Sequence, residues 1–372
     1  MRHQSSSRCH VASLLLLLGL HACNASLTSD ELAFIAAVRN KSDAPADFDA
    51  ACTEEGYMRI ERLARLLSVA LRSVDHTYRL GSKKQSVGLG GIFAQPANTR
   101  GLDYKQVKTR FVHSGLCSQL DHAPQKRNGL PRTTNICEVG FNSGHSAMLF
   151  LETVGAAAVS STRAQHHHGV DASRVVSFDI GGFPWTARAA ALMGHAYPPT
   201  RFEYVDGDST TTIPAYKRAH PEFACDALLI DGAKDATIRY LDLHQLNKMS
   251  NPGALLFFDE ICTQACANGT EPCGDCWGGT PNAYARATQL SMLTLDACAW
   301  PPGYEGKDGI CRGHYLSPEE AGKVALKQQG EEAEAMRAKL AAGSADKHGR
   351  GLTTLEGFPT LSELKTLQSR EP

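Results

Sequence analysis

From about residue 135 onward, short apolar runs alternate with helical stretches, and this alternation constrains the fold more than any other feature of the sequence. The apolar runs predict strands at 135–139, 174–180, 201–205, 225–230 and 254–259. The segments between and after them predict helices near 145–155, 183–194, 236–248 and 281–290. Strands that alternate with helices form right-handed crossovers and a parallel sheet that is covered on both faces. The sequence therefore predicts an α/β fold with a doubly wound, mostly parallel sheet.

The segments that flank this region predict three further parts of the chain. Residues 291–299 and 310–316, joined by Pro- and Gly-containing sequence, are typical of an antiparallel hairpin at one edge of the sheet. Residues 26–130 predict a helical N-terminal extension, in which 58–71 has the apolar spacing of an amphipathic helix. The α/β domain then covers 131–317, and 318–372 is expected to form a charged helical tail.

The N-terminus has the pattern of a signal peptide, which we place at residues 1–25. A basic lead is followed by an apolar stretch at 11–20, which is too short for a stable transmembrane helix. Cleavage after Ala25 fits the small-residue rule. A lipoprotein site at Cys23 is the alternative, and His21 disfavours it. We therefore expect the chain in the secretory lumen or outside the cell, as a glycoprotein with no stable membrane span after cleavage; its sequons are at Asn24, Asn40 and Asn268.

The charge balance excludes one class of partner. The 372 residues include 38 Lys and Arg against 39 Asp and Glu, a formal net charge of -1. A general nucleic-acid binder usually carries a basic face that releases phosphate counterions. We therefore expect no nucleic-acid partner, and the hydrophobic content of 42% excludes a disordered chain.

The chain has 12 cysteines, and cleavage would remove two of them. Four follow one another closely after the fifth predicted strand: Cys262, Cys266, Cys273 and Cys276. Their spacing suits either a zinc site or two disulfides, and an oxidising lumen favours the disulfides. A redox pair at Cys273 and Cys276 is a lesser option. Cys298 and Cys311 lie on the two hairpin strands and are expected to form a further disulfide.

In an open parallel sheet the ligand binds beyond the carboxyl ends of the strands. After the first strand, Gly140 and Gly144 permit a tight turn, and Ser146 at the start of the helix offers donors to a carboxylate. The second strand ends at Asp179, which can accept hydrogen bonds from a ribose diol. Asp208 and Ser209 follow the third strand and could meet an adenine edge.

The fourth and fifth strand ends carry three carboxylates, Asp231, Asp259 and Glu260. Hard oxygen ligands of this kind suit a shared Mg²⁺ or Mn²⁺ ion. Lys234 lies one turn past Asp231, where a partly desolvated lysine can act as general base. The alternative is that Asp231 and Asp259 only cap the helices that follow.

Residues 135 to about 316 resemble the class I S-adenosylmethionine-dependent methyltransferases. The segment from Glu138 to Ser146 is similar to the first motif of the catechol-type O-methyltransferases, and the sequences around Asp179 and Asp208 are similar to sugar-type, macrocin-like relatives. The resemblance implies a set of cosubstrate-binding residues: Glu138, Gly140, Asn142, Gly144, Ser146, Asp179, Asp208 and Ser209. It also implies that Asp231, Asp259 and Glu260 hold the metal and that Lys234 is catalytic, so a chelator is expected to abolish transfer.

Two departures leave the acceptor open. Glu260 stands where catechol-type relatives usually have Asn, and Lys234 stands where sugar-type relatives usually have His. The expected acceptor is therefore a hydroxyl of a small molecule or glycan. The competing function is a catalytically silent binding module with the same fold. A nicotinamide-dependent oxidoreductase is disfavoured, because positions 142 and 145 are Asn and His where its phosphate-binding motif has glycine.

Overall fold

A computed structural model describes residues 27–40, 45, 48–71, 77–80, 83–86, 104–122, 126–127, 130–131, 134–162, 173–263, 280–303 and 309–324. Its centre is a seven-stranded sheet of order β7-β6-β5-β8-β9-β11-β10. The five parallel strands are β5 (Ile136–Val139), β6 (Val175–Asp179), β7 (Phe202–Asp206), β8 (Cys225–Ile230) and β9 (Ser250–Ile261). The predicted strands and the doubly wound sheet are thereby confirmed.

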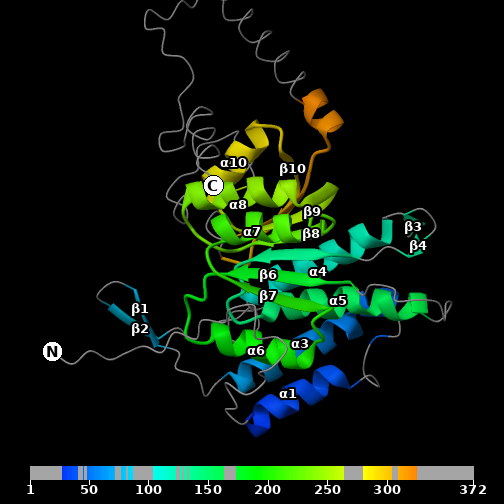
Figure 1. The fold of residues 1–372 in the computed structure, drawn as a ribbon, viewed down its shortest axis with the longest axis vertical. Helices are drawn as coiled ribbons and strands as arrows, with labels where there is room; N and C mark the ends of the chain where they lie inside the picture. The colour runs from blue at the N-terminus through cyan, green and yellow to red at the C-terminus, as the bar shows by residue number, and fades with distance from the viewer. Residues whose placement is uncertain are drawn as a thin grey trace, which may run out of the picture.

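Helices cover both faces of the sheet. Figure 1 shows α7 (Ser209–Ala219), α8 (Ala236–Lys248) and α10 (Thr280–Gln289) on one side. On the other side are α5 (His145–Thr162) and α6 (Thr186–Ala196), with α1 and α3 of the N-terminal extension packed beyond them. All the residues of β5 and β8 are buried, as expected for strands between two helical layers.

One helix of the α/β domain was not predicted. Helix α7 begins after Asp208, whose side chain caps it by accepting a hydrogen bond from the backbone N–H of Thr210. Three threonines at 210–212 and Pro214 lie in its first two turns, and both residue types have low helix propensity. The cap and the packing of Ile213 and Tyr216 against the sheet stabilise the helix where local propensity does not.

The predicted edge hairpin is present, with its second strand inserted into the sheet. Strand β11 (Gly309–Tyr315) pairs antiparallel with both β9 and β10 (Leu293–Ala299). Cys298 lies directly opposite Cys311 in this register, and the predicted disulfide joins them.

The N-terminal extension is mainly helical and packs on the α5–α6 face. It contains α1 (Ser29–Arg39), α2 (Phe48–Ala51), α3 (Glu54–Ala70) and α4 (Tyr104–His122), with two short hairpins. The hairpins are β1 (Thr77–Leu80) with β2 (Lys83–Ser86), and β3 (Lys126–Arg127) with β4 (Leu130–Pro131). Helix α3 confirms the predicted amphipathic helix: Ile60, Leu63 and Leu67 are buried in the core that it shares with α5.

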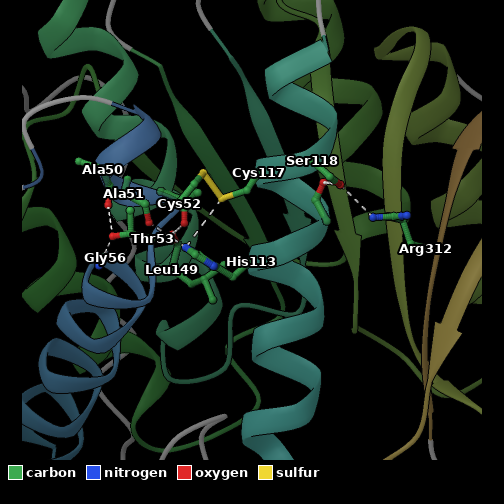
Figure 2. Close-up of a disulfide and its surroundings, with 12 residues drawn as sticks. Ala50, Ala51, Cys52, Thr53, Gly56, His113, Cys117, Ser118, Leu149 and Arg312 are labelled. Carbon is green, nitrogen blue, oxygen red and sulfur yellow. Dashed lines mark hydrogen bonds between the residues drawn. A yellow bond between two sulfur atoms is a disulfide. The ribbon is translucent and has the colours of Figure 1, made fainter.

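Two further disulfides, which the sequence analysis did not predict, connect parts of the chain that are distant in sequence. Cys137 of β5 is bonded to Cys225 of β8, the neighbouring strand. Cys52, just after α2, is bonded to Cys117 of α4, 65 residues later. Figure 2 shows this second disulfide beside His113, whose Nε2 donates to the carbonyl oxygen of Ala51 at 3.0 Å. Helix α4 is therefore attached covalently to the segment between α2 and α3.

Several expectations fall wholly or partly outside the described residues. They include the signal peptide at 1–25, Cys266, Cys273 and Cys276, and the tail beyond residue 324. Cys262 is disulfide-bonded, as the disulfide alternative for this cluster requires. At the start of the tail, Lys323 forms an ion pair with Glu319 at 2.7 Å. Within the described part of the chain, no helix has the length and apolar character that crossing a membrane demands.

Candidate active site

The turn that follows β5 depends on a glycine at position 140. Gly140 has φ of +98°, a backbone conformation that disfavours any residue with a Cβ. A Cβ on Gly140 would lie 2.4 Å from the backbone carbonyl oxygen of Asp231. Asn142 and Gly144 in the same turn also have positive φ. The turn therefore lies directly against the end of β8, with no room for a side chain between them.

Glu138 lies at the base of this turn and is completely buried. Its carboxyl group accepts hydrogen bonds from the hydroxyls of Ser146 on α5 and Ser177 on β6, the second at 2.7 Å. Burial raises the pKa of Glu138 to about 8, because the charged form loses its hydration. Glu138 thus connects β5, β6 and the start of α5 beneath the turn.

Asp179, at the end of β6, lies over the same turn. Its two carboxylate oxygens accept backbone N–H groups from Asn142 and Gly181, each at 2.8 Å. The side-chain oxygen of Asn142 in turn accepts a hydrogen bond from the indole N–H of Trp185 at 2.6 Å. Burial raises the pKa of Asp179, although these backbone donors favour the carboxylate. The predicted cosubstrate residues of β5 and β6 therefore form one connected group.

His145 belongs to this group, although the sequence analysis assigned it no role. The buried ring lies between two hydroxyls, with Ser143 2.7 Å from Nδ1 and Ser68 2.8 Å from Nε2. Ser68 is on α3, so the contact connects the turn to the N-terminal extension. A single histidine at the start of a helix gives no signal in the sequence for such a bridge.

The two residues expected at the adenine edge have structural contacts in this molecule. Asp208 caps α7, accepting both the backbone N–H and the hydroxyl of Thr210. Ser209 begins the helix next to Asp242 of α8, a fully buried carboxyl group whose pKa burial raises to about 7. The structure therefore places Asp208 and Ser209 after β7 as predicted and gives Asp208 a capping role.

The structure groups the three acidic residues beyond β8 and in β9 with basic side chains. Lys234 lies 2.9 Å from the carboxylate of Asp231 and 2.7 Å from that of Glu260. The guanidinium of Arg239, which is fully buried on α8, lies 3.2 Å from Glu260 and donates to backbone carbonyl oxygens of the β8 end. Glu260 has φ of +66°, so its side chain leaves the strand in an unusual direction.

The third cation comes from outside the α/β domain. Lys108 of α4 lies 2.5 Å from the carboxylate of Asp259, and only 8% of its side chain is exposed. The same Asp259 oxygen accepts the backbone N–H of Glu260 at 2.8 Å. Lys108 lies 151 residues away in sequence, in a segment without a recognised motif. No pattern in the sequence could have linked it to the strand ends.

The predicted metal ligands do not fit a divalent cation in this arrangement. Asp231 and Glu260 each contact Lys234, and Asp259 contacts Lys108. Among the described residues, no three or more His, Cys, Asp or Glu side chains converge on one point as metal ligands do. The chain thus places its own cations where the resemblance implies Mg²⁺ or Mn²⁺.

The same ion pairs determine the protonation of Lys234. Burial alone would lower its pKa, but the carboxylates of Asp231 and Glu260 raise it above the usual value. Burial alone would raise the pKa of Asp231, and the neighbouring Lys234 and Arg239 lower it. At neutral pH these contacts favour an ammonium and a carboxylate, whereas the predicted general-base role of Lys234 requires the neutral amine.

A small cavity adjoins these charges between α4, α5 and the sheet. Its polar lining consists of Lys108, Thr109, Ser146, Asp231 and Asp259. Val112, Leu149, Leu229 and Ile310 form its apolar walls. The cavity is therefore bordered both by Ser146 in the first turn of α5 and by the acids at the ends of β8 and β9.

Comparison with known proteins gives a match within the α/β domain. A family model described as a methyltransferase domain matches residues 137–261, which run from β5 through the last residue of β9. The matched residues lie within the region whose sequence resembles the class I methyltransferases. A search of curated proteins found no match to the chain.

Solved structures with similar folds have low sequence identity to this chain. An O-methyltransferase from Bacillus cereus in complex with SAH is 16% identical, with 49% of this chain and 73% of that one covered and a TM-score of 0.35. The O-methyltransferase TomG from Streptomyces achromogenes, in complex with SAM, is 19% identical, with coverage of 49% and 73% and a TM-score of 0.36. Cofactor-bound Rv0187 from MTB is 18% identical, with coverage of 73% and 97% and a TM-score of 0.41.

Proposed function

We propose that this protein is an S-adenosylmethionine-dependent O-methyltransferase that acts on a hydroxyl of a small molecule or glycan. The observation that carries the proposal is the contact between the turn after β5 and the end of β8. Because Gly140 lies against the Asp231 carbonyl, a methyl donor held by the turn is next to the acids that border the cavity. Methyl transfer requires this adjacency, since the protein mainly aligns donor and acceptor.

On the donor side, the group around Asp179 would hold the cosubstrate. Each carboxylate oxygen has two acceptor positions, and one on each oxygen already accepts a backbone N–H. The remaining positions suit the two hydroxyls of a ribose. Backbone N–H groups at the start of α5 suit the carboxylate of the amino-acid part. When bound, S-adenosylmethionine supplies an electrophilic methyl group on a sulfonium, which leaves as a neutral thioether.

On the acceptor side, Asp231 would take the proton of the hydroxyl. Lys234 and Arg239 keep this residue ionised, and an ionised carboxylate is a proton acceptor. Lys234 would then contribute its positive charge near the acceptor oxygen rather than act as base. A metal-assisted version, with Mg²⁺ or Mn²⁺ held by Asp231, Asp259 and Glu260, remains a prediction of the resemblance, and we derive no step from it.

The test is binding and transfer measured on the same preparation. Calorimetric titration with S-adenosylmethionine should show one site, and labelled cosubstrate should transfer its methyl group to at least one of a panel of phenols, sugars and glycans. The Asp231→Asn variant should bind the cosubstrate as the parent does and transfer at least 100-fold more slowly. Binding without transfer to any acceptor would favour the silent module, and no binding would overturn the proposal.

We also propose that the enzyme works in the secretory pathway. The described disulfides Cys52–Cys117, Cys137–Cys225 and Cys298–Cys311 suit an oxidising compartment. Expression with a C-terminal tag tests this, because a processed signal shortens the N-terminus and an N-glycan changes the mass after glycosidase treatment. A full-length, unglycosylated and reduced product would contradict it.

A further inference from the structure

Among the described residues of the N-terminal extension, Lys108 is the one that places a cation at the site. Its Nζ atom lies 2.5 Å from Asp259, and its side chain is almost completely buried. Burying a lysine costs free energy, and pairing its ammonium with a carboxylate offsets only part of that cost. Asp259 stabilises the ammonium there and fixes its direction.

The surroundings of Lys108 make its charge effective on a bound ligand. Lys108 lines the same cavity as Asp231 and Ser146, and four aliphatic side chains form the rest of the wall. Charges interact more strongly at a buried site than in water, because the effective dielectric constant there is lower. An ammonium carries a full positive charge, so it attracts a negative charge that develops nearby as well as the carboxylate with which it is paired.

The other two cations, Arg239 and Lys234, do not line this cavity. Arg239 is fully buried on α8, with its donors directed to backbone carbonyls and Glu260. Lys234 contacts Asp231 and Glu260. Among the residues that line this cavity, Lys108 is therefore the basic side chain.

We propose, resting on the proposed function, that Lys108 stabilises the negative charge that develops on the acceptor oxygen during methyl transfer. The Lys108 ammonium would thus take the electrostatic role that the resemblance assigns to a divalent metal ion. A preorganised charge of this kind is worth about 10²–10³ in rate.

The experiment measures the ionisation of a bound phenol and does not require the natural acceptor. 4-Nitrophenol is titrated spectrophotometrically with the full chain saturated with S-adenosylhomocysteine. The bound probe should ionise at least one pH unit below the free probe in the parent protein. Lys108→Met should abolish this shift, and Lys108→Arg should retain most of it, because the charge is kept. Lys323→Met is the matched control, since Lys323 is exposed and is paired with the exposed Glu319.

A second variant distinguishes a direct role from neutralisation of Asp259. If Lys108 only balanced that carboxylate, Lys108→Met combined with Asp259→Asn would restore the parent's probe shift and transfer rate, and this result would overturn the proposal. A parent protein that binds S-adenosylhomocysteine but does not shift the probe would also overturn it, leaving the proposed function in place. A protein that binds no S-adenosylhomocysteine would instead refute the proposed function.

Discussion

Asp179 accepts a hydrogen bond of 2.8 Å from the backbone N–H of Asn142, and this contact joins the end of β6 to the turn after β5. Its second oxygen accepts the N–H of Gly181 at the same distance. One carboxylate therefore holds two loops in place at the position that we propose for the methyl donor. Preorganisation of this kind reduces the conformational cost of binding.

Replacing Asp179 with Ala should weaken the binding of S-adenosylmethionine by at least 10-fold. The change removes both loop contacts and the acceptor proposed for the ribose, and hydrogen bonds to a charged group are worth about 1.5–3 kcal/mol each. Calorimetry gives the dissociation constant. Asp296→Ala, on edge strand β10, is the control and should bind as the parent does. Equal affinities for the two variants would remove Asp179 from the donor site.

Replacing Gly140 with Ala should disrupt both the fold and the donor site. The new Cβ would lie 2.4 Å from the Asp231 carbonyl oxygen, in a backbone conformation that alanine disfavours. We expect a loss of roughly 2–4 kcal/mol in the free energy of unfolding. Gly194→Ala is the matched control on α6, where a Cβ has nothing within 4 Å, and it should be neutral or slightly stabilising. Urea denaturation of both variants measures the difference, and a Gly140→Ala protein as stable as the parent would contradict the close contact.

Glu138 should make the protein less stable as the pH rises. Its pKa is about 8 in the folded protein and near 4.5 when exposed, so between these values the folded state holds a proton that the unfolded state releases. The free energy of unfolding therefore falls by up to about 1.4 kcal/mol per pH unit from this group. Glu138→Gln is neutral at every pH and should not show this loss.

Urea denaturation from pH 5 to pH 8 checks this expectation. The stability of Glu138→Gln relative to the parent should increase steadily over the range. The exposed Glu55→Gln on α3 serves as control and should follow the parent's pH dependence. A difference between Glu138→Gln and the parent that does not vary with pH would show that Glu138 is ionised in the folded protein.

The sequence predicted the sheet because periodicity and strand ends are local signals. The five parallel strands and the Cys298–Cys311 hairpin follow from runs of apolar residues and their turns. The turn glycines and Asp179 were selected as candidates because ligands bind at the carboxyl ends of parallel strands. These parts of the site depend on residues close to one another in sequence.

What the sequence did not reveal depends on contacts between distant segments. Lys108 and Ser68 reach the site from helices whose local patterns indicate only core packing. Arg239 lies on a predicted helix, but its burial at the β8 end has no local signature. The positions of Asp231 and Glu260 were predicted, and their pairing with Lys234 was not. The pairing of charges at the site could therefore be seen only in the three-dimensional structure.

Loss of the Cys52–Cys117 disulfide should destabilise the protein more than loss of Cys298–Cys311. The first closes a span of 65 residues and the second a span of 13, so the unfolded chain gains more entropy from the first. Loop-closure entropy gives about 4 kcal/mol for the first and about 3 for the second. Thermal denaturation of the Cys52→Ser/Cys117→Ser and Cys298→Ser/Cys311→Ser variants compares them. The first variant should also lose activity, since Cys117 fixes the helix that carries Lys108. The opposite order of stability would contradict this prediction.

Removing divalent metal ions should leave methyl transfer largely intact. Asp231 and Asp259 are already paired with the ammonium groups of Lys234 and Lys108, and a divalent cation would have to displace these ammonium groups. We therefore expect the transfer rate to change by less than about twofold after dialysis against a chelator, well below the 10²–10³ that loss of one preorganised charge costs.

The Lys108→Met variant provides the comparison: with its ammonium absent, added Mg²⁺ or Mn²⁺ should restore part of the rate if the vacated carboxylates can bind it. A parent enzyme that loses activity in chelator and regains it with Mg²⁺ would instead establish the metal site that the resemblance implies.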